Sequence, residues 1–335
     1  MEQARRRAEA APPRELGRAM KSSVLITCYR RRAFLKLAVA SVVADGADEV
    51  VVVKDWTDPE TDAWLQERGV KVVTEDIPVV GEMMARGLAE CTGESVSFLD
   101  DDDMFAPGKV AAVRQAFEDD PELLLFRTGW TEVDVDGAPY PDRHLAQPDR
   151  VHSFRTTDID AGVFRWIVEN RSYGTLSTQS VRRRALEAKV ADLRHVECVT
   201  DVSMALLMMS EPGRHRFDPR PLTIRRIGSG RRYAHPVHSG AHRRTFTALR
   251  NGATSPAARQ YAEMNLRWGR LEILLGGPRL ALLEKWTDLV RHQRHRIDAV
   301  VVKQSLKTAV RFVFPLTVEK VTNPPRTRAS PPVGP

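Results

Sequence analysis

The stretch Val96-Ser97-Phe98-Leu99-Asp100-Asp101-Asp102-Asp103 decides the fold, because a short apolar run meets four consecutive carboxylates in it. The apolar part has the composition of a buried strand. Crowded carboxylates repel one another, so a cluster at a strand end is unfavourable unless positive charge shares the site. Oxygen-only ligands favour a hard cation, Mg²⁺ or Mn²⁺, and such ions commonly bridge to phosphates. The alternative is a solvated acidic turn before the next helix.

The segments around this stretch alternate between strand and helix. Strands are predicted at 23–27, 50–53, 70–74 and 96–100, with helices at 33–44, 59–68 and 79–91 between them. This alternation predicts an α/β fold with a doubly wound, mostly parallel sheet. Ligands of such sheets bind outside the carboxyl ends of the strands. We therefore expect one crevice to be lined by Thr27-Cys28-Tyr29, Asp55 and Asp100–Asp103.

The remaining chain is predicted to extend this domain and then to become helical. Further helices are expected at 107–118, 160–170, 182–191 and 201–210, strands at 123–127, 175–181 and 222–227, a hairpin at 131–137 and a surface loop at 138–156. Helices at 257–275 and 278–310 follow. The expected organisation is a tail at 1–20, a domain at 21–233 with halves 21–135 and 136–233, a helical extension at 234–323 and a tail at 324–335.

Composition narrows the class of protein. A hydrophobic content of 42% in 335 residues is enough for a substantial core. Three widely spaced cysteines fit neither a disulfide framework nor a zinc pattern, which favours a reducing, cytoplasmic location. The net charge of +7 has a local source, because segment 214–244 holds nine arginines against Asp218 alone. That segment predicts either an anionic ligand, such as a pyrophosphate or a lipid phosphate, or simply a solubilising surface.

Two features near the chain ends leave alternatives open. Met20 directly precedes the first strand, so either translation starts there or residues 1–20 form a disordered tail. Segment 298–315 is basic and amphipathic, and such a segment can lie on the inner face of an anionic membrane. A helix packed on the main domain is the other interpretation, which the abundance of ordinary amphipathic helices favours.

Four motifs in this order resemble the family 2 glycosyltransferases of the GT-A fold, over residues 22–233. Ser23 to Arg31 is similar to the opening strand S-V-I-I-P-T-Y-N-R of that family, and Val52 to Asp58 is similar to V-V-D-D-G-S-T-D. Met84 to Glu94 resembles the helix and turn before the metal-binding strand. Phe98 to Asp103, with Pro107 beyond, resembles F-L-D-x-D-D…P. Lys54 and Trp56 depart from the pattern, because an acid and a small residue are usual there.

The resemblance implies a nucleotide-sugar donor site with a divalent metal, Mn²⁺ or Mg²⁺. Asp102 would bind the metal, with Asp103 in support, and Asp101 would be merely exposed. The donor would be contacted by Thr27, Tyr29, Asp55, Arg86, Asp100, Arg231 and Arg232. The last two lie in a segment that resembles the mobile loop over the donor, where arginines would clamp the pyrophosphate.

The family also uses a general base that deprotonates the acceptor hydroxyl. Thr200-Asp201 stands where the resemblance implies an acidic pair, so Asp201 is the candidate base and Glu197 the reserve. The alternative for Asp201 is a first-turn charge favoured by the helix dipole. The implied activity is inverting, metal-dependent transfer of a sugar from a nucleotide diphosphate-sugar to a hydroxyl of a glycan, lipid-linked or small-molecule acceptor.

Two other functions remain open at this point. A sugar-phosphate nucleotidyltransferase has the same kind of fold, but it usually carries a glycine-rich loop with a lysine after the first strand, and Tyr29 to Arg32 has none. A non-enzymatic module could instead bind a polyanion through segment 214–244. Because that segment has few aromatic residues to stack on bases, nucleic acid is not the expected partner.

Overall fold

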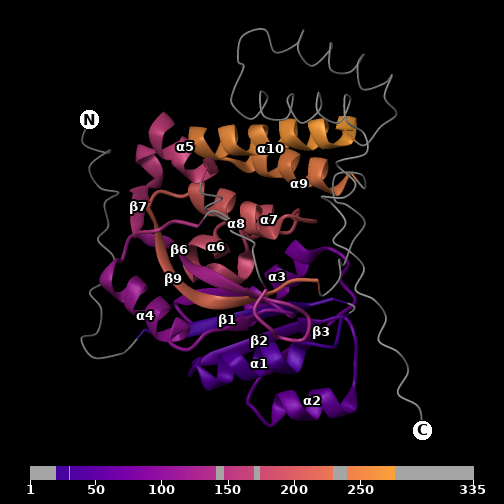
Figure 1. Cartoon of the computed structure of the whole chain (residues 1–335). Helices are drawn as coiled ribbons and strands as arrows, with labels where there is room; N and C mark the ends of the chain where they lie inside the picture. The colour runs from indigo at the N-terminus through magenta and orange to yellow at the C-terminus, as the bar shows by residue number, and fades with distance from the viewer. Residues whose placement is uncertain (1–19, 30, 141–146, 170–173, 229–239, 276–335) are drawn as a thin grey trace, which may run out of the picture.

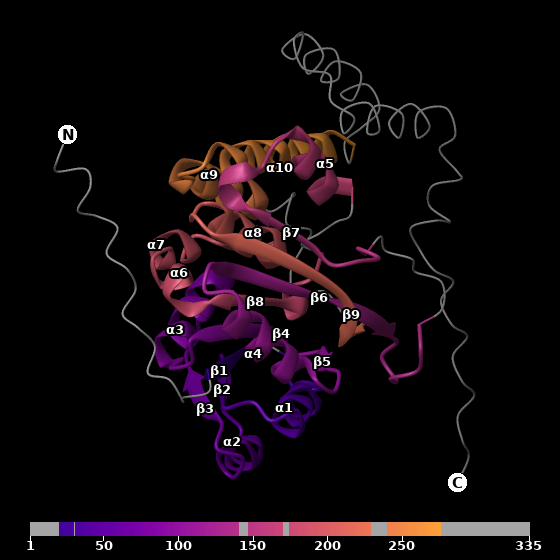
Figure 2. The same ribbon diagram turned by 90° about the vertical axis from the view of Figure 1, so that its left-hand side faces the viewer.

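The computed structural model describes residues 20–275 except Arg30, 141–146, 170–173 and 229–239. Within these residues nine strands form one mixed sheet between two helical layers (Figures 1 and 2). The strand order is β3-β2-β1-β4-β8-β6-β9-β5, and β7 pairs with β9 off this path. The strands are β1 (Ser22–Cys28), β2 (Glu49–Lys54), β3 (Lys71–Thr74), β4 (Ser95–Asp100), β5 (Met104–Phe105), β6 (Leu123–Val133), β7 (His152–Arg155), β8 (Gln179–Arg182) and β9 (Arg214–Arg226).

The expected α/β fold is confirmed, with a sheet that is parallel in its first half and mixed beyond it. The pairs β1–β2, β2–β3, β1–β4 and β6–β9 are parallel. Strand β8 runs antiparallel to both β4 and β6, and β5 and β7 run antiparallel to β9. Strand β8, the neighbour of β4 in the sheet, therefore runs opposite to the strand that ends in the acidic stretch. The local sequence does not reveal this reversal.

Two layers of helices cover the sheet (Figure 1). Apolar clusters join one face to α1 (Leu35–Ala44), α2 (Pro59–Gln66) and α4 (Lys109–Asp119). The other face packs against α3 (Val80–Glu90), α6 (Arg183–Glu187), α7 (Val190–Leu193) and α8 (Thr200–Met209), with α5 (Ala161–Glu169), α9 (Ala241–Gly252) and α10 (Pro256–Leu275) outside them. Short 3₁₀ turns lie at Thr156–Asp158 and Leu176–Thr178.

The pleat explains why the first strands are apolar throughout. In β1, Val24 and Ile26 face the α1 side, whereas Leu25 faces α3, and all three are at most 1% exposed. Each buried Val, Leu or Ile side chain stabilises the fold by roughly 1.5–3 kcal/mol relative to exposure. Because both faces bury apolar side chains, the strand reads as a continuous apolar run rather than as an alternating pattern.

Several local predictions were wrong in the second half of the chain. The loop expected at 138–156 contains β7, and the helix expected at 182–191 is divided into α6 and α7. The strand expected at 222–227 is the end of the much longer β9. By contrast, the hairpin expected at 131–137 is present. Segment 131–133 ends β6, the chain turns through Gly137, and it returns antiparallel through the Val133–Pro139 bridge and the hydrogen bond from the Tyr140 N–H to the Glu132 carbonyl. The predicted helix 278–310, and with it segment 298–315, lies outside the described residues.

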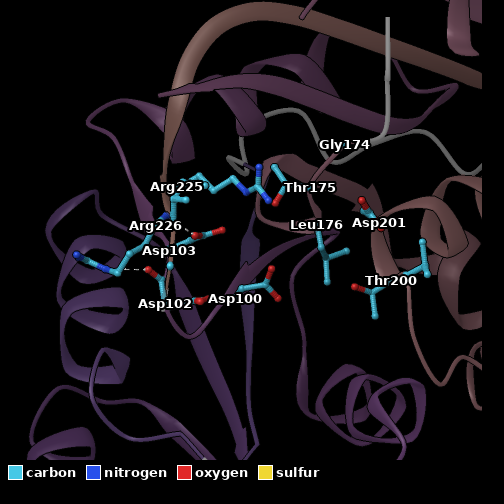
Figure 3. Close-up of a pocket in the computed structure, with 13 residues that line it drawn as sticks. Asp100, Asp102, Asp103, Gly174, Thr175, Leu176, Thr200, Asp201, Arg225 and Arg226 are labelled. Atoms are coloured by element: carbon cyan, nitrogen blue, oxygen red, sulfur yellow. Dashed lines mark hydrogen bonds between the residues drawn. The ribbon is translucent and has the colours of Figure 1, made fainter. Parts of the chain in front are cut away.

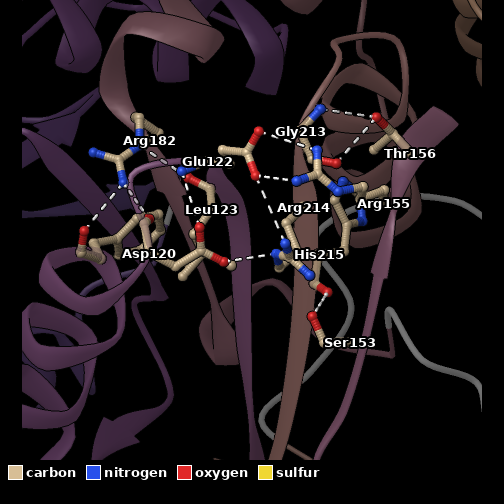
Figure 4. Close-up of polar contacts among 11 residues, drawn as sticks. Asp120, Glu122, Leu123, Ser153, Arg155, Thr156, Arg182, Gly213, Arg214 and His215 are labelled. Atoms are coloured by element: carbon tan, nitrogen blue, oxygen red, sulfur yellow. Dashed lines mark hydrogen bonds and ion pairs between the residues drawn. The ribbon is translucent and has the colours of Figure 1, made fainter. Parts of the chain in front are cut away.

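An ion-pair network fastens the far edge of the sheet, where α4, β6, β7 and β9 meet (Figure 4). Arg214 pairs with Asp120, with 2.8 Å between Nε and Oδ2, and Arg155 pairs with Glu122. The Arg182 guanidinium donates to the carbonyls of Phe117, Asp120 and Leu123. These bonds satisfy carbonyl groups at the end of α4 and beyond it. No helix within the described part of the chain is long and apolar enough to cross a membrane.

Candidate active site

A cavity of about 530 Å³ opens at the carboxyl ends of the central strands (Figure 3). Asp100, Asp102 and Asp103 line one side of it, and Thr200 and Asp201 stand on the opposite side. Its remaining wall is contributed by Gly174, Thr175, Leu176, Val199, Arg225, Arg226, Ile227 and Gly228. The cavity therefore brings together four separate parts of the chain, and three of these contribute its acidic and basic groups.

The acidic turn, formed by Asp100 to Asp103 at the end of β4 (Ser95–Asp100), is held in place by hydrogen bonds from distant segments. The Asp100 backbone N–H donates to Ser177 Oγ at 3.0 Å. Asp103 is 3% exposed, and its carboxylate accepts from Ser177 Oγ at 2.6 Å and from the Arg226 backbone N–H at 2.9 Å. Because β5 follows directly and pairs with β9, the turn is closed against the strand that carries Arg226.

Burial sets the protonation of Asp103. Burial, followed by the neighbouring carboxylates of Asp100 and Asp102, raises the pKa of Asp103 to about 8, although the bonds from Ser177 and Arg226 act in the opposite direction. Both carboxylate oxygens of Asp103 already accept hydrogen bonds, one from Ser177 and one from the Arg226 backbone. This arrangement agrees with a supporting position for Asp103.

Asp101 is buried, so the expectation that it would be merely exposed was wrong. Its side chain is 2% exposed and forms an ion pair with Arg31, which follows β1. Arg31 Nε also donates to Asp101 Oδ2 at 3.3 Å, and its Nη1 lies 2.7 Å from Asp102 Oδ2. The partner is 70 residues distant in sequence, and sequence reasoning gave Arg31 no role.

Asp201 reaches the cavity from the first turn of α8, as predicted from the sequence. The residue before that turn, Val199, has φ 52° and ψ 49°, a left-handed conformation that is unusual for a β-branched side chain. Gln179 Nε2 donates to the Asp201 carbonyl at 3.0 Å. Burial raises the pKa of the Asp201 carboxyl, and backbone N–H groups of the same turn act against that rise. A raised pKa makes the carboxylate a stronger base.

Glu197, the reserve candidate, is engaged elsewhere. Both of its carboxylate oxygens accept from Arg244 of α9 at 2.6 Å, and its side chain does not line the cavity. A bidentate ion pair of this kind holds the carboxylate in one orientation. Of the two candidates, only Asp201 therefore faces the acidic turn.

The predicted residues from β1 and β2 lie at the same edge of the sheet as the acidic turn. Thr27 is in register with Asp100, and Cys28 is in register with Lys54, the residue before Asp55. Tyr29 follows β1 and is 4% exposed, within the apolar core. These strand ends do converge on one edge, although Thr27, Tyr29 and Asp55 do not line the 530 Å³ cavity itself.

The substitution of Lys54 for the usual acid is compensated internally. Its side chain is fully buried, and its Nζ lies 2.7 Å from Asp62 Oδ1 of α2. Its ammonium group also lies 4.6 Å from the centre of the Trp56 ring. The lysine therefore forms a structural ion pair under the strand end, and it presents no charge to the cavity.

Of the three predicted arginines, only Arg86 lies in the described part of the chain, and two other arginines line the cavity. Arg86 lies outside the cavity, where it forms ion pairs with Glu75 and Glu82. Arg231 and Arg232 lie outside the described residues. Arg225 and Arg226, which end β9, line the cavity instead. In the sequence these two arginines were marked only by their place directly before Ile227-Gly228, in the segment that resembles the mobile loop over the donor.

The carboxylates at the cavity wall fit the divalent metal that the resemblance implies only if the substrate supplies further ligands. Within the described residues, no three His, Cys, Asp or Glu side chains form a group that could hold a metal ion. Asp100 and Asp102 nevertheless bring two carboxylates to the cavity wall. Mg²⁺ is commonly held by one or two carboxylates together with substrate phosphates rather than by an all-protein cage. The residues present fit such a shared site.

Sequence comparison relates the first half of the chain to a known family. Residues 23–187 match the model of the family described as Glycosyl transferase family 2. An uncharacterized glycosyltransferase of Nostoc sp. is 35% identical over 107 residues, which are 30% of this chain and 33% of the Nostoc protein. The chain thus spans about a third of the length of this curated relative.

Solved structures show a similar fold. S. aureus TarS 1-349 in complex with UDP-GlcNAc has a TM-score of 0.54 and 15% identity, over 74% of this chain and 70% of that one. S. aureus TarS 1-349 alone has a TM-score of 0.52 and 14% identity, over 90% of this chain and 82% of that one. At this level of identity the likeness extends to the fold alone.

Proposed function

We propose that this chain, which belongs to glycosyl transferase family 2 through residues 23–187, transfers a sugar from a nucleotide diphosphate-sugar to a hydroxyl acceptor with inversion at the anomeric carbon. One observation carries the proposal. A candidate base, Asp201, stands across a single cavity from the carboxylates of Asp100 and Asp102, with Arg225 beside them. A donor between these groups would have its leaving group on one side and its acceptor on the other.

The proposed reaction is a direct displacement. The acceptor oxygen forms a bond to the anomeric carbon while the bond from that carbon to the β-phosphate oxygen breaks. The acceptor proton passes to the Asp201 carboxylate, and the nucleoside diphosphate leaves with the bonding electron pair. The burial that raises the pKa of Asp201 supports this role, because a carboxylate of ordinary pKa is a weak base toward a hydroxyl.

Positive charge beside the acidic turn would stabilise the departing diphosphate. Arg225 extends across the cavity toward Thr175, and its Nη1 lies 3.1 Å from Glu132 Oε1. Arg226 is oriented differently, because its guanidinium donates to the carbonyls of Asp134 and Val135. We therefore assign the contact with phosphate to Arg225 and a structural role to the Arg226 side chain.

Asp100 and Asp102 are the residues that would hold Mn²⁺ or Mg²⁺. When bound, such an ion supplies charge stabilisation for the diphosphate as it leaves. Asp103, through its bonds to Ser177 and Arg226, would fix the turn on which both ligands stand. Because the structural neighbour TarS was solved with UDP-GlcNAc and with UDP, uridine nucleotide sugars are the first donors to test.

The test is release of nucleoside diphosphate from a panel of nucleotide sugars with Mn²⁺, in the presence and absence of hydroxyl acceptors. Loss of a general base typically lowers the rate by about 10²–10⁴-fold, so we expect Asp201→Asn to lower kcat in that range with unchanged donor affinity. Glu197→Gln is the matched control, because Glu197 is paired with Arg244 away from the cavity. Full activity of Asp201→Asn would refute the assignment of the base.

The polyanion-binding alternative loses support because more than half of the described arginines in the basic segment form ion pairs with carboxylates. Within the described part of 214–244, four arginines form ion pairs, three of them with acids from other parts of the chain: Arg214 with Asp120, Arg220 with Asp218, Arg225 with Glu132, and Arg244 with Glu197. In the part of 214–244 that the structure describes, the arginines therefore do not form a continuous free surface.

A further inference from the structure

Arg31 occupies the carboxylate that the proposed metal would need. Its Nη1 lies 2.7 Å from Asp102 Oδ2, and the two side chains are 21% and 13% exposed. A divalent cation on the same carboxylate would lie beside the guanidinium, and two like charges at that distance repel each other strongly in a partly buried site. Arg31 and the metal therefore compete for Asp102.

The position of Arg31 is fixed by a second carboxylate. Its Nη2 and Nε both bind Asp101, which is 2% exposed and has no access to the cavity wall. Bidentate pairing to a buried acid is the stronger kind of ion pair, and breaking it would leave a buried charge uncompensated. The two bonds to Asp101 thus keep the guanidinium in place, and only the bond from Nη1 to Asp102 needs to break.

We propose that Arg31 holds Asp102 in the donor-free protein and releases it when a nucleoside diphosphate arrives, so that metal and nucleotide bind together rather than independently. The inference rests on the proposed function, because it takes Asp102 as a metal ligand. A diphosphate brings negative charge that can accept the hydrogen bond of Nη1 while Asp101 keeps the rest of the guanidinium in place. Each ligand then raises the affinity for the other.

The experiment measures Mn²⁺ binding to the full chain by electron paramagnetic resonance, with and without UDP. Removing a charge-assisted contact and a neighbouring cation should raise the affinity of the nucleotide-free protein for Mn²⁺ by about tenfold in Arg31→Gln. The same variant should show a smaller increase in Mn²⁺ affinity on addition of UDP than the wild type does.

Arg32→Gln is the matched control, because Arg32 is the next residue and its guanidinium instead lies 4.8 Å from the centre of the Trp56 ring. It removes the same charge and should leave both Mn²⁺ affinities within about twofold of the wild type, since exposed charges are strongly screened. Arg31→Lys keeps a positive charge beside Asp101 but cannot bind both carboxylates in the manner of a guanidinium. It is the variant to measure if Arg31→Gln does not fold. We expect intermediate Mn²⁺ affinity from it.

Unchanged Mn²⁺ affinity in both Arg31 variants, or an equal rise in Arg32→Gln, would overturn the inference. The proposed function is tested separately by sugar transfer in the wild type. If transfer occurs and Arg31→Gln binds Mn²⁺ like the wild type, only the inference fails. If the wild type binds no Mn²⁺ even with UDP, the metal site fails together with the inference.

Discussion

Lys109 should give the protein a measurable dependence of stability on pH. Its side chain is fully buried at the start of α4, where Nζ donates to Thr128 Oγ1 at 2.9 Å, Thr223 Oγ1 at 3.0 Å and the Ser177 carbonyl at 3.1 Å. Burial, followed by the charge of Arg127, lowers the pKa of Lys109 from 10.5 to about 7.

The sign and size of the effect follow from proton counting. Between about pH 7 and 10.5 the unfolded chain holds a proton on this lysine that the folded protein lacks, so stability rises with pH by up to about 1.4 kcal/mol per pH unit. From pH 7, where the folded group is half-titrated, to pH 9 this amounts to about 2 kcal/mol. Lys109→Met removes the titrating group and should remove this contribution.

The assay is urea unfolding of the wild type and Lys109→Met at several pH values from 7 to 9. The difference between their free energies of unfolding cancels groups that titrate alike in both. We expect it to change by about 2 kcal/mol in favour of the wild type as the pH rises. A difference that stays constant with pH would refute the argument that Lys109 is neutral in the folded protein at alkaline pH.

Three further predictions concern packing, hydrogen bonding and thiol chemistry. Gly87→Ala should lower the free energy of unfolding by about 1–3 kcal/mol in urea titrations, because its Cβ would lie 2.2 Å from Leu25 Cδ1. Arg182→Met should lower the same free energy by about 2–4 kcal/mol, because three carbonyl groups lose a charged donor. A thiol reagent at pH 8 should modify the native protein far more slowly than the urea-unfolded chain, because burial raises the pKa of Cys91 to about 12 and that of Cys198 to about 11. Unchanged unfolding midpoints in the two variants, or equal thiol reaction rates, would contradict these expectations.

The first half of the fold was predictable because its signals are local. The apolar runs that became β1, β2 and β4 are buried on both faces, and Pro59 marks the start of α2. The acidic turn and the first turn of α8 were found for the same reason. Each is a short pattern at an element boundary, where the chain must expose or satisfy polar groups.

The second half could not be read in this way, because its structure depends on distant partners. Strand β9 contains Pro219 and Pro221, which normally argue against a strand. They are tolerated because the pairing with β6 shifts register around Gly129. A Cβ at position 129 would lie 2.5 Å from the Pro219 carbonyl oxygen, so only glycine leaves room for that carbonyl. A bulge of this kind is a property of two strands rather than of either sequence.

The parts of the site that sequence reasoning missed are likewise pairwise. Asp101 appeared exposed because its partner Arg31 is remote in the chain, and Arg225 appeared to belong to a free basic segment because Glu132 is on another strand. The pattern of residues indicated which groups are candidates for the chemistry. It did not indicate which of them neutralise one another once the sheet has formed.

The most direct test of the central claim is a crystal structure of the protein with UDP and Mn²⁺. The account predicts the diphosphate in the cavity between the acidic turn and Arg225, the metal on Asp100 and Asp102, and open space toward Asp201 for the acceptor. A nucleotide bound elsewhere, or a cavity that stays empty at saturating UDP, would contradict it.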